Sequence, residues 1–114
     1  MIAAGTYRHR ITIQDCSVAE NALGEVLPVW QDVVTGASAL VEDLRGRELL
    51  AAQEIHGEVD TKIRLRYRSG ITARMRVMFR GKPYNIQAVI RADAVNVELI
   101  LLCSTGLVAN STPS

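Results

Sequence analysis

Residues 62–82 read KIRLRYRSGITARMRVMFRGK, and apolar and basic residues alternate in both halves of this stretch. The alternating apolar residues are Ile63, Leu65 and Tyr67 in the first half and Met75, Val77 and Phe79 in the second. Because successive side chains of a β-strand point to opposite faces, each half predicts a strand with one apolar and one basic face. We expect the two strands to pair across residues 69–73, so that their basic faces form one continuous surface.

Similar patterns extend along the chain on both sides of this stretch. Strands are predicted over residues 7–14, 26–34, 37–44, 58–68, 74–80, 83–91 and 95–103, with turns at residues 35–36, 81–82 and 91–94. The predicted core consists of Ile11, Ile13, Ile63, Leu65, Tyr67, Val77, Phe79, Tyr84, Ile86, Leu99 and Leu101. Short strands separated by turn residues are typical of a mainly β fold, here a small antiparallel β-barrel or sandwich.

One short α-helix is predicted within RGRELLAAQEIHG, residues 45–57, and it covers about residues 45–56. The segment is rich in good helix formers. Leu49, Ala52 and Ile55 recur at helical spacing and form an apolar stripe. Asp43 is the expected N-cap and Gly57 the expected C-terminal stop.

Residues 15–25, DCSVAENALGE, have no clean period and predict a long loop. A long loop in a compact domain is usually functional or mobile. We therefore expect one domain over residues 1–103 with this loop inside it. The polar residues 104–114 are expected to form a C-terminal tail.

The composition of the 114 residues argues against several classes of protein. Cys16, Cys103, His9 and His56 are scattered and lack zinc or redox spacing, so no metal or other cofactor is expected. No signal peptide and no membrane-spanning run is visible, which favours a soluble protein made in a cytosol. No catalytic motif occurs, and we do not expect an enzyme.

The charges are segregated along the chain. Residues 15–60 carry ten acidic and two basic residues, and residues 61–114 carry nine basic and two acidic residues. The predicted basic face consists of Arg64, Arg66, Arg68, Arg74 and Arg76, and the acidic candidates to meet it are Glu42, Asp43, Glu48 and Glu54. Like charges side by side on a sheet repel, so the basic face requires acids or phosphates nearby. Three interpretations remain open: a salt-bridged surface, a contact with an acidic neighbour, or a contact with DNA phosphates.

Several motifs together resemble one known family. They are GxYRHRITIQ from Gly5, a variable segment ending in Gly24-Glu25, a strand with Trp30, the helix GRELLAAQ, and the strands IRLRYRSGI and MRVMFRGKPYNIQAV before a final LLC. In this order they resemble the phage head–tail joining family, also called head–tail adaptor, head completion or stopper proteins. The resemblance covers residues 5–103, and similar proteins occur in gene transfer agents and prophages.

This resemblance implies a structural protein of the virion neck, made in the cytoplasm of a bacterial host. It implies a ring of identical subunits, most simply a hexamer, between a portal-side adaptor ring and the tail terminator or tail tube proteins. Such a ring extends the channel for DNA, which it contacts without sequence specificity, and stopper members retain the packaged genome.

The predicted loop is the candidate for a gate in the channel or for a contact with an adjacent ring. Its candidate residues are Glu20, Asn21, Leu23, Gly24 and Glu25. The alternative function is a sequence-independent nucleic-acid-binding module that uses the basic residues of the stretch 62–82. Such a module would bind duplex DNA with a strong dependence on salt.

Overall fold

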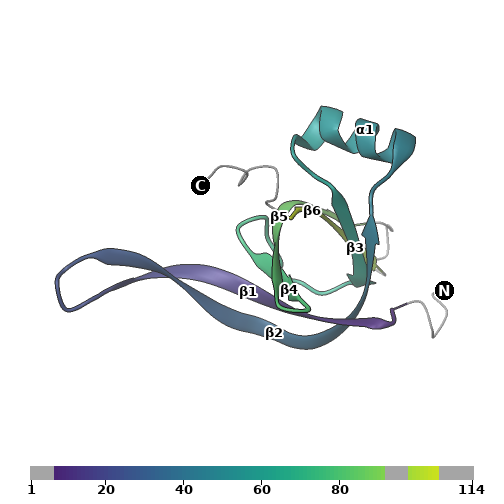
Figure 1. Ribbon diagram of the computed structural model, residues 1–114. Coiled ribbons are helices and arrows are strands. Elements are labelled where there is room, and N and C mark those ends of the chain that lie inside the picture. The colour runs from purple at the N-terminus through teal and green to yellow at the C-terminus, as the bar shows by residue number, and fades with distance from the viewer. Residues whose placement is uncertain (1–6, 92–97, 106–114) are drawn as a thin grey trace.

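The computed structural model describes residues 7–91 and 98–105, and these residues form a mainly β fold with one helix (Figure 1). The elements are β1 (His9–Glu20), β2 (Val26–Asp43), α1 (Gly46–His56), β3 (Thr61–Arg66), β4 (Arg76–Phe79), β5 (Lys82–Arg91) and β6 (Glu98–Ser104). The predicted fold class is therefore confirmed. The predicted turn at residues 91–94 and the start of the last predicted strand fall largely outside the described residues, as do residues 106–114.

The six strands close into a small barrel in the order β1-β2-β3-β6-β5-β4, and every neighbouring pair is antiparallel. One face of each strand points into the barrel, where Ile13, Ile63, Val77 and Leu101 are completely buried. Nine of the eleven predicted core residues are buried, and Tyr67 and Phe79 are partly buried against them. Alternation in the sequence therefore predicted the core well.

A second apolar cluster lies outside the barrel, under α1. Leu44, Val59 and Leu102 are buried there, and Leu49 and Ala52 of the helix pack against them. The third residue of the predicted stripe, Ile55, is 76% exposed, so that part of the prediction is wrong. Only part of the helix face reaches the barrel, and Ile55 is left at its rim.

The two predicted helix caps have different outcomes. Gly57 has φ of 79°, and its N–H donates to the carbonyl of Gln53, as expected for a C-terminal stop. Asp43 is not the N-cap, because it still belongs to β2, where it pairs with Thr61. Arg45 occupies the N-cap position and makes no side-chain capping bond.

The predicted long loop at residues 15–25 is wrong. β1 continues to Glu20 and β2 starts at Val26, and their pairing runs without interruption from Gln14↔Asp32 to Glu20↔Val26. The two strands leave the barrel together as a hairpin arm, residues 15–32, which Figure 1 shows extending far beyond the other strands. No core lies against either face of this arm, so its sequence lacks the alternation that marks a half-buried strand.

The end of the arm is a short ordered turn. The Asn21 side-chain oxygen accepts hydrogen bonds from the backbone N–H groups of Leu23 and Glu25, at 2.9 and 3.0 Å. Gly24 has φ of +83°, a conformation that other residues adopt with difficulty. Asn21 and Gly24 therefore define the turn, in agreement with their known preference for such positions.

Two predicted turns are placed differently in the structure. Thr35 and Gly36 do not end a strand: β2 is continuous, and the shift from Ile11↔Ala37 to Ile13↔Val34 makes a β-bulge there, with φ of +68° at Gly36. The turn between β4 and β5 consists of Arg80 and Gly81, one residue earlier than predicted, since Lys82 already starts β5.

Candidate functional site

The predicted continuous basic surface does not exist. β3 pairs with β2 and β6, whereas β4 pairs with β1 and β5. In the closed order two strands separate β3 from β4 in either direction, so β3 and β4 lie on opposite sides of the barrel. The prediction assumed that strands close in sequence pair, which is usual but not obligatory. The strand β6, at the end of the described chain, takes the place beside β3 instead.

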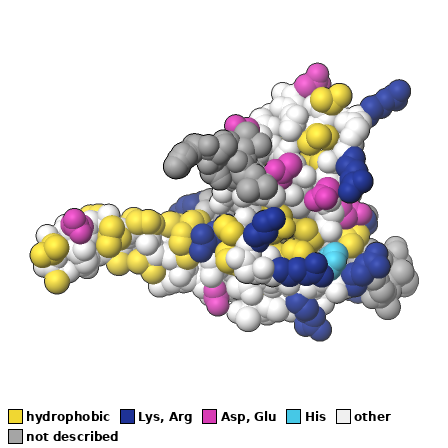
Figure 2. Space-filling view, viewed as in Figure 1, with side chains coloured by type: hydrophobic (Ala, Val, Ile, Leu, Met, Phe, Trp, Pro, Cys, Tyr) yellow, Lys and Arg dark blue, Asp and Glu magenta, His cyan; other side chains and the backbone are white. Residues whose placement is uncertain are grey.

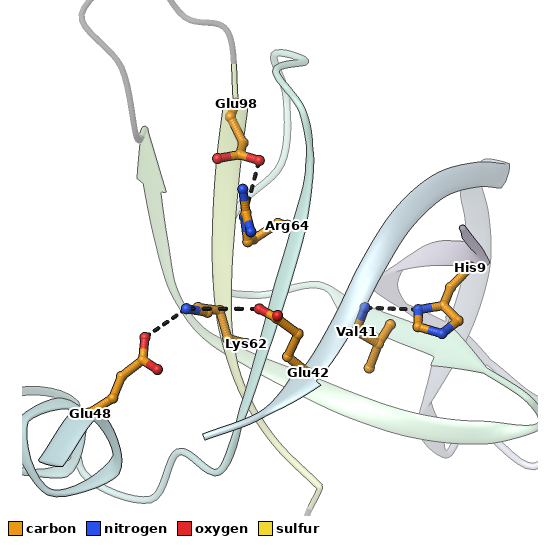
Figure 3. Close-up of polar contacts among 7 residues, drawn as sticks. All are labelled: His9, Val41, Glu42, Glu48, Lys62, Arg64 and Glu98. Atoms are coloured by element: carbon orange, nitrogen blue, oxygen red, sulfur yellow. Dashed lines mark hydrogen bonds and ion pairs between the residues drawn. The ribbon is translucent and has the colours of Figure 1, made fainter. Parts of the chain in front are cut away.

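On the β3 side, the basic side chains find acids within the same chain. The Lys62 ammonium lies 2.6 Å from a carboxylate oxygen of Glu48 and 3.8 Å from one of Glu42 (Figure 3). Glu42 is also the cross-strand partner of Lys62, because the end of β2 pairs with β3. Lys62 thus engages two of the four acidic candidates inside the subunit, Glu42 and Glu48.

Arg64 is held by a largely buried carboxylate. Its Nε donates to Oε2 of Glu98 at 3.1 Å, and the Tyr7 hydroxyl donates to the same oxygen at 2.8 Å. Burial, together with this hydrogen bond to Glu98, raises the pKa of Tyr7 to about 12. The Arg66 guanidinium lies 5.9 Å from the centre of the Tyr7 ring. Tyr7, Arg64 and Glu98 therefore form a polar cluster that ties the start of the described chain to β3 and β6.

Replacing Arg64 is expected to destabilise the fold rather than only alter its surface. In the Arg64→Ala variant the Glu98 carboxylate, of which 12% is exposed, loses its cation. The Tyr7 hydroxyl still donates to this carboxylate, but removing the charged partner of a largely buried carboxylate costs about 1–3 kcal/mol. Urea unfolding followed by circular dichroism measures this loss. Arg68→Ala, at an exposed position after β3, is the matched control and should change stability by less than about 0.5 kcal/mol. Equal effects of the two variants would contradict this role of Arg64.

On the β4 side, two arginines brace the root of the arm. Arg74 forms two hydrogen bonds with the Asp15 carboxylate, at 3.1 and 2.9 Å. These bonds lower the pKa of Asp15 and raise that of Arg74. Arg76 donates to the Gln14 side chain at 2.8 Å, and its guanidinium stacks 4.1 Å from the centre of the Trp30 ring.

The remaining predicted interface residues lie on the surface. Asp43 forms an exposed ion pair with Arg45 at 3.7 Å, and Asp43 also lines a polar hollow with Asp60 and Tyr84. Glu54 and Arg68 are exposed. A contact between any of these residues and a neighbouring subunit stays a prediction.

The arm exposes apolar side chains that the sequence interpretation missed, apart from Leu23. The exposed fractions are 70% for Val18, 83% for Leu23, 64% for Val26 and 47% for Leu27. Glu20 and Glu25 lie at the end of the arm beside Asn21, whose amide donates to Glu25 at 2.8 Å. In Figure 2 the arm appears mostly hydrophobic beyond its root, while the visible Lys and Arg side chains lie over the barrel and helix. The five predicted loop residues are therefore brought together at the end of the arm.

A second apolar surface, which the sequence interpretation also missed, is a groove between α1 and the outside of the barrel. Its apolar lining comes from three residues of α1, three of the barrel and one residue between β2 and α1: Ala51, Ala52, Ile55, Ile90, Ile100, Leu102 and Leu44. Its volume is about 300 Å³, and Glu48, His56 and Lys62 contribute polar edges. We call it the α1 groove.

The histidines and cysteines form no recognisable chemical site in the part of the chain that the structure describes. The Nδ1 atom of His9 accepts a hydrogen bond from the Val41 N–H at 3.0 Å (Figure 3), a structural role. Burial raises the pKa of the Cys103 thiol. No three His, Cys, Asp or Glu side chains of residues 7–91 and 98–105 come together as a metal site requires. No helix among these residues is long and apolar enough to span a bilayer.

Comparison with known proteins identifies a family, and the similar solved structures include two that are informative. The family model described as phage head completion protein matches residues 2–106. The solution structure of protein SF1141 from Shigella flexneri is similar with a TM-score of 0.68 and 28% identity over 90% of this chain and 96% of that one. A chain from the virion of a native gene transfer agent particle is similar with a TM-score of 0.55 and 15% identity over 82% and 90% of the two chains. No curated protein matches the chain.

Proposed function

The chain belongs to the phage head completion protein family, and from this premise we propose that it forms a ring in the neck of a virion, between the head and the tail. The observation that carries the proposal is the match of the family model over residues 2–106. The family is one of structural virion proteins, and we propose an assembly role without catalysis. The ring, most simply a hexamer, would join a portal-side adaptor ring to the tail terminator or tail tube proteins.

The distribution of charge supports assembly with identical copies. The arm carries four acidic residues and no basic one, whereas the other described residues carry thirteen basic and seven acidic residues. An acidic projection on a basic body suits a head-to-tail contact, and such contacts close into rings when the rotation allows. Complementary charge would fix the partner and its orientation more than it adds affinity.

The shape and charge of the arm support a role in DNA retention or in contact with the next ring. It projects from the barrel as an ordered hairpin, and Glu20 and Glu25 at its end would repel DNA mildly in a channel. Lumen-facing arms of a ring would narrow the channel, and arms directed along its axis would reach the adjacent ring. In both cases the arm is the part of the subunit that acts at a distance from its own barrel.

The alternative, a nucleic-acid-binding module, has less support. Arg64 and Arg74 are paired with carboxylates, and Arg76 covers the Trp30 ring, which is then less open to stacking by a base. The basic residues of β3 and β4 also lie on opposite sides of the barrel. No extended basic track follows from this arrangement.

Electron microscopy of particles from the source tests the proposal. We expect this chain as a ring between portal and tail. Particles that lack the chain, together with tight and salt-dependent binding of duplex DNA by the free monomer, would refute the neck role and favour the alternative.

A further inference from the structure

The large apolar side chains that the described residues expose are concentrated in two places. Val18, Leu23, Val26 and Leu27 lie on the arm, and Val33 follows at its root. The others are Leu50 and Ile55 on α1 and Ile90 on the barrel, and the last two line the α1 groove. Scattered exposed apolar residues need no explanation, but residues gathered in this way mark interaction surfaces.

The two surfaces have complementary shapes. The end of the arm is convex and narrow, since Leu23 projects from a short turn with 83% of its surface exposed. The α1 groove is concave and has room for a few side chains, with a volume of about 300 Å³. A projecting aliphatic anchor that enters an apolar pocket is a common centre of binding energy at protein interfaces.

One subunit cannot bring these surfaces together. The arm extends from one side of the barrel, and α1 lies over another side (Figure 1). The arm is also braced in its direction, because Arg74 and Arg76 hold its root at Asp15, Gln14 and Trp30. The groove of one copy is therefore available only to the arm of another.

Charge favours a second copy of this chain as the occupant. The arm has a net charge of −4, and the other described residues have a net charge of +6. Opposite charges steer the arm of one copy toward the body of another and disfavour contacts between two arms. Lys62, at the edge of the α1 groove, is already paired with Glu48 and Glu42, so the attraction comes from the excess of basic residues on the body as a whole and not from the groove itself.

We propose that the end of the arm of one subunit, centred on Leu23, inserts into the α1 groove of the next copy, beside Ile55. This contact rests on the proposed ring, for which it names the subunit interface, and an arm engaged in this way lies along the ring instead of facing the channel or the adjacent ring. It is heterologous, because the two partners use different surfaces, so it continues from subunit to subunit until the ring closes.

Thiol cross-linking between two single variants tests the contact. One chain carries Leu23→Cys and the other Ile55→Cys, both in a Cys16→Ser background, and the buried Cys103 is left in place. The mixed chains are treated with a short bis-maleimide at high protein concentration. Because docked groups have a high effective concentration, we expect a heterodimer yield about tenfold above that of the control. The control replaces Ile55→Cys with Leu50→Cys, which is also exposed on α1 but does not line the groove.

Each outcome decides the proposal. A strong heterodimer with Ile55→Cys and a weak one with Leu50→Cys supports it. Equal yields, or no heterodimer at the highest soluble concentration, would overturn it. So would cross-linking of Ile55→Cys in particles to a protein of a different mass, since the occupant would then be another virion protein. In these cases a ring of this chain at the neck would still stand, because electron microscopy tests it separately.

Discussion

Shortening the arm is expected to abolish head completion while the barrel stays folded. Residues 17–20 and 26–29 form four matched cross-strand pairs, from Ser17↔Val29 to Glu20↔Val26. Deleting both segments joins Cys16 to Asn21 and Glu25 to Trp30, so the existing pair Cys16↔Trp30 takes the place of the last pair before the turn. The variant retains the turn, the strand register and the bracing residues. It loses the reach of the arm together with Glu20 and the exposed apolar residues Val18, Val26 and Leu27.

The barrel is expected to stay folded because of where the removed residues lie. All eight are exposed or, like Val29, incompletely buried, and none belongs to either apolar cluster. Surface changes of this kind alter stability by about 0.5 kcal/mol, which is about 2–4 °C in melting temperature for a domain of this size. Infectious or transducing titre, and the fraction of heads that carry tails and retain DNA, are the measurements.

A variant with a normal melting temperature that completes heads at the parental level would contradict the role of the arm. A variant that melts much earlier would show instead that the arm supports the barrel. The matched control is Leu50→Ser, which removes one exposed apolar side chain from α1 and leaves both the arm and the α1 groove intact. We expect this control to complete heads normally.

The sequence predicted the barrel better than the arm, and burial explains the difference. Ile63 and Leu65 alternate with basic residues because one face of β3 lies in the core and the other in solvent. The two strands of the arm have exposed residues on both faces, so no alternation reveals them. The sequence of the hairpin turn did contain a local signal. Asn21 and Gly24 favour a tight turn, and apolar residues lie in the chain both before and after it.

The sequence predicted several residues of the candidate site, but it did not predict which residues they contact. The sequence indicated that the arginines need partners, but Asp15 lies 59 positions from Arg74, and Glu98 lies 34 positions from Arg64. Such partners depend on which strands become neighbours in the closed order. The position of β6 between β3 and β5 is a tertiary feature, and local propensity does not contain it. The α1 groove was missed for the same reason, because Ile55 and Ile90 meet only after closure.

Ile13→Ala is expected to produce the largest loss of stability among single substitutions in β1. Ile13 is completely buried, and it pairs with Val34 of β2 on one side and Val77 of β4 on the other, where the barrel closes. Truncating a buried isoleucine to alanine costs about 2–5 kcal/mol. Each kcal/mol lowers the melting temperature of a domain of this size by about 4–8 °C.

Val18→Ala, five residues further along the same strand, is the matched control. Val18 is 70% exposed on the arm, and its truncation should change the free energy of unfolding by less than about 0.5 kcal/mol. Urea unfolding followed by circular dichroism compares the two variants, and similar losses would contradict the division of β1 into a barrel half and an arm half. If Ile13→Ala loses much more stability than Val18→Ala, packing inside the subunit requires a large apolar side chain at position 13 but not at position 18. The apolar character of the arm then requires a cause outside its own subunit, and a contact with another chain provides one.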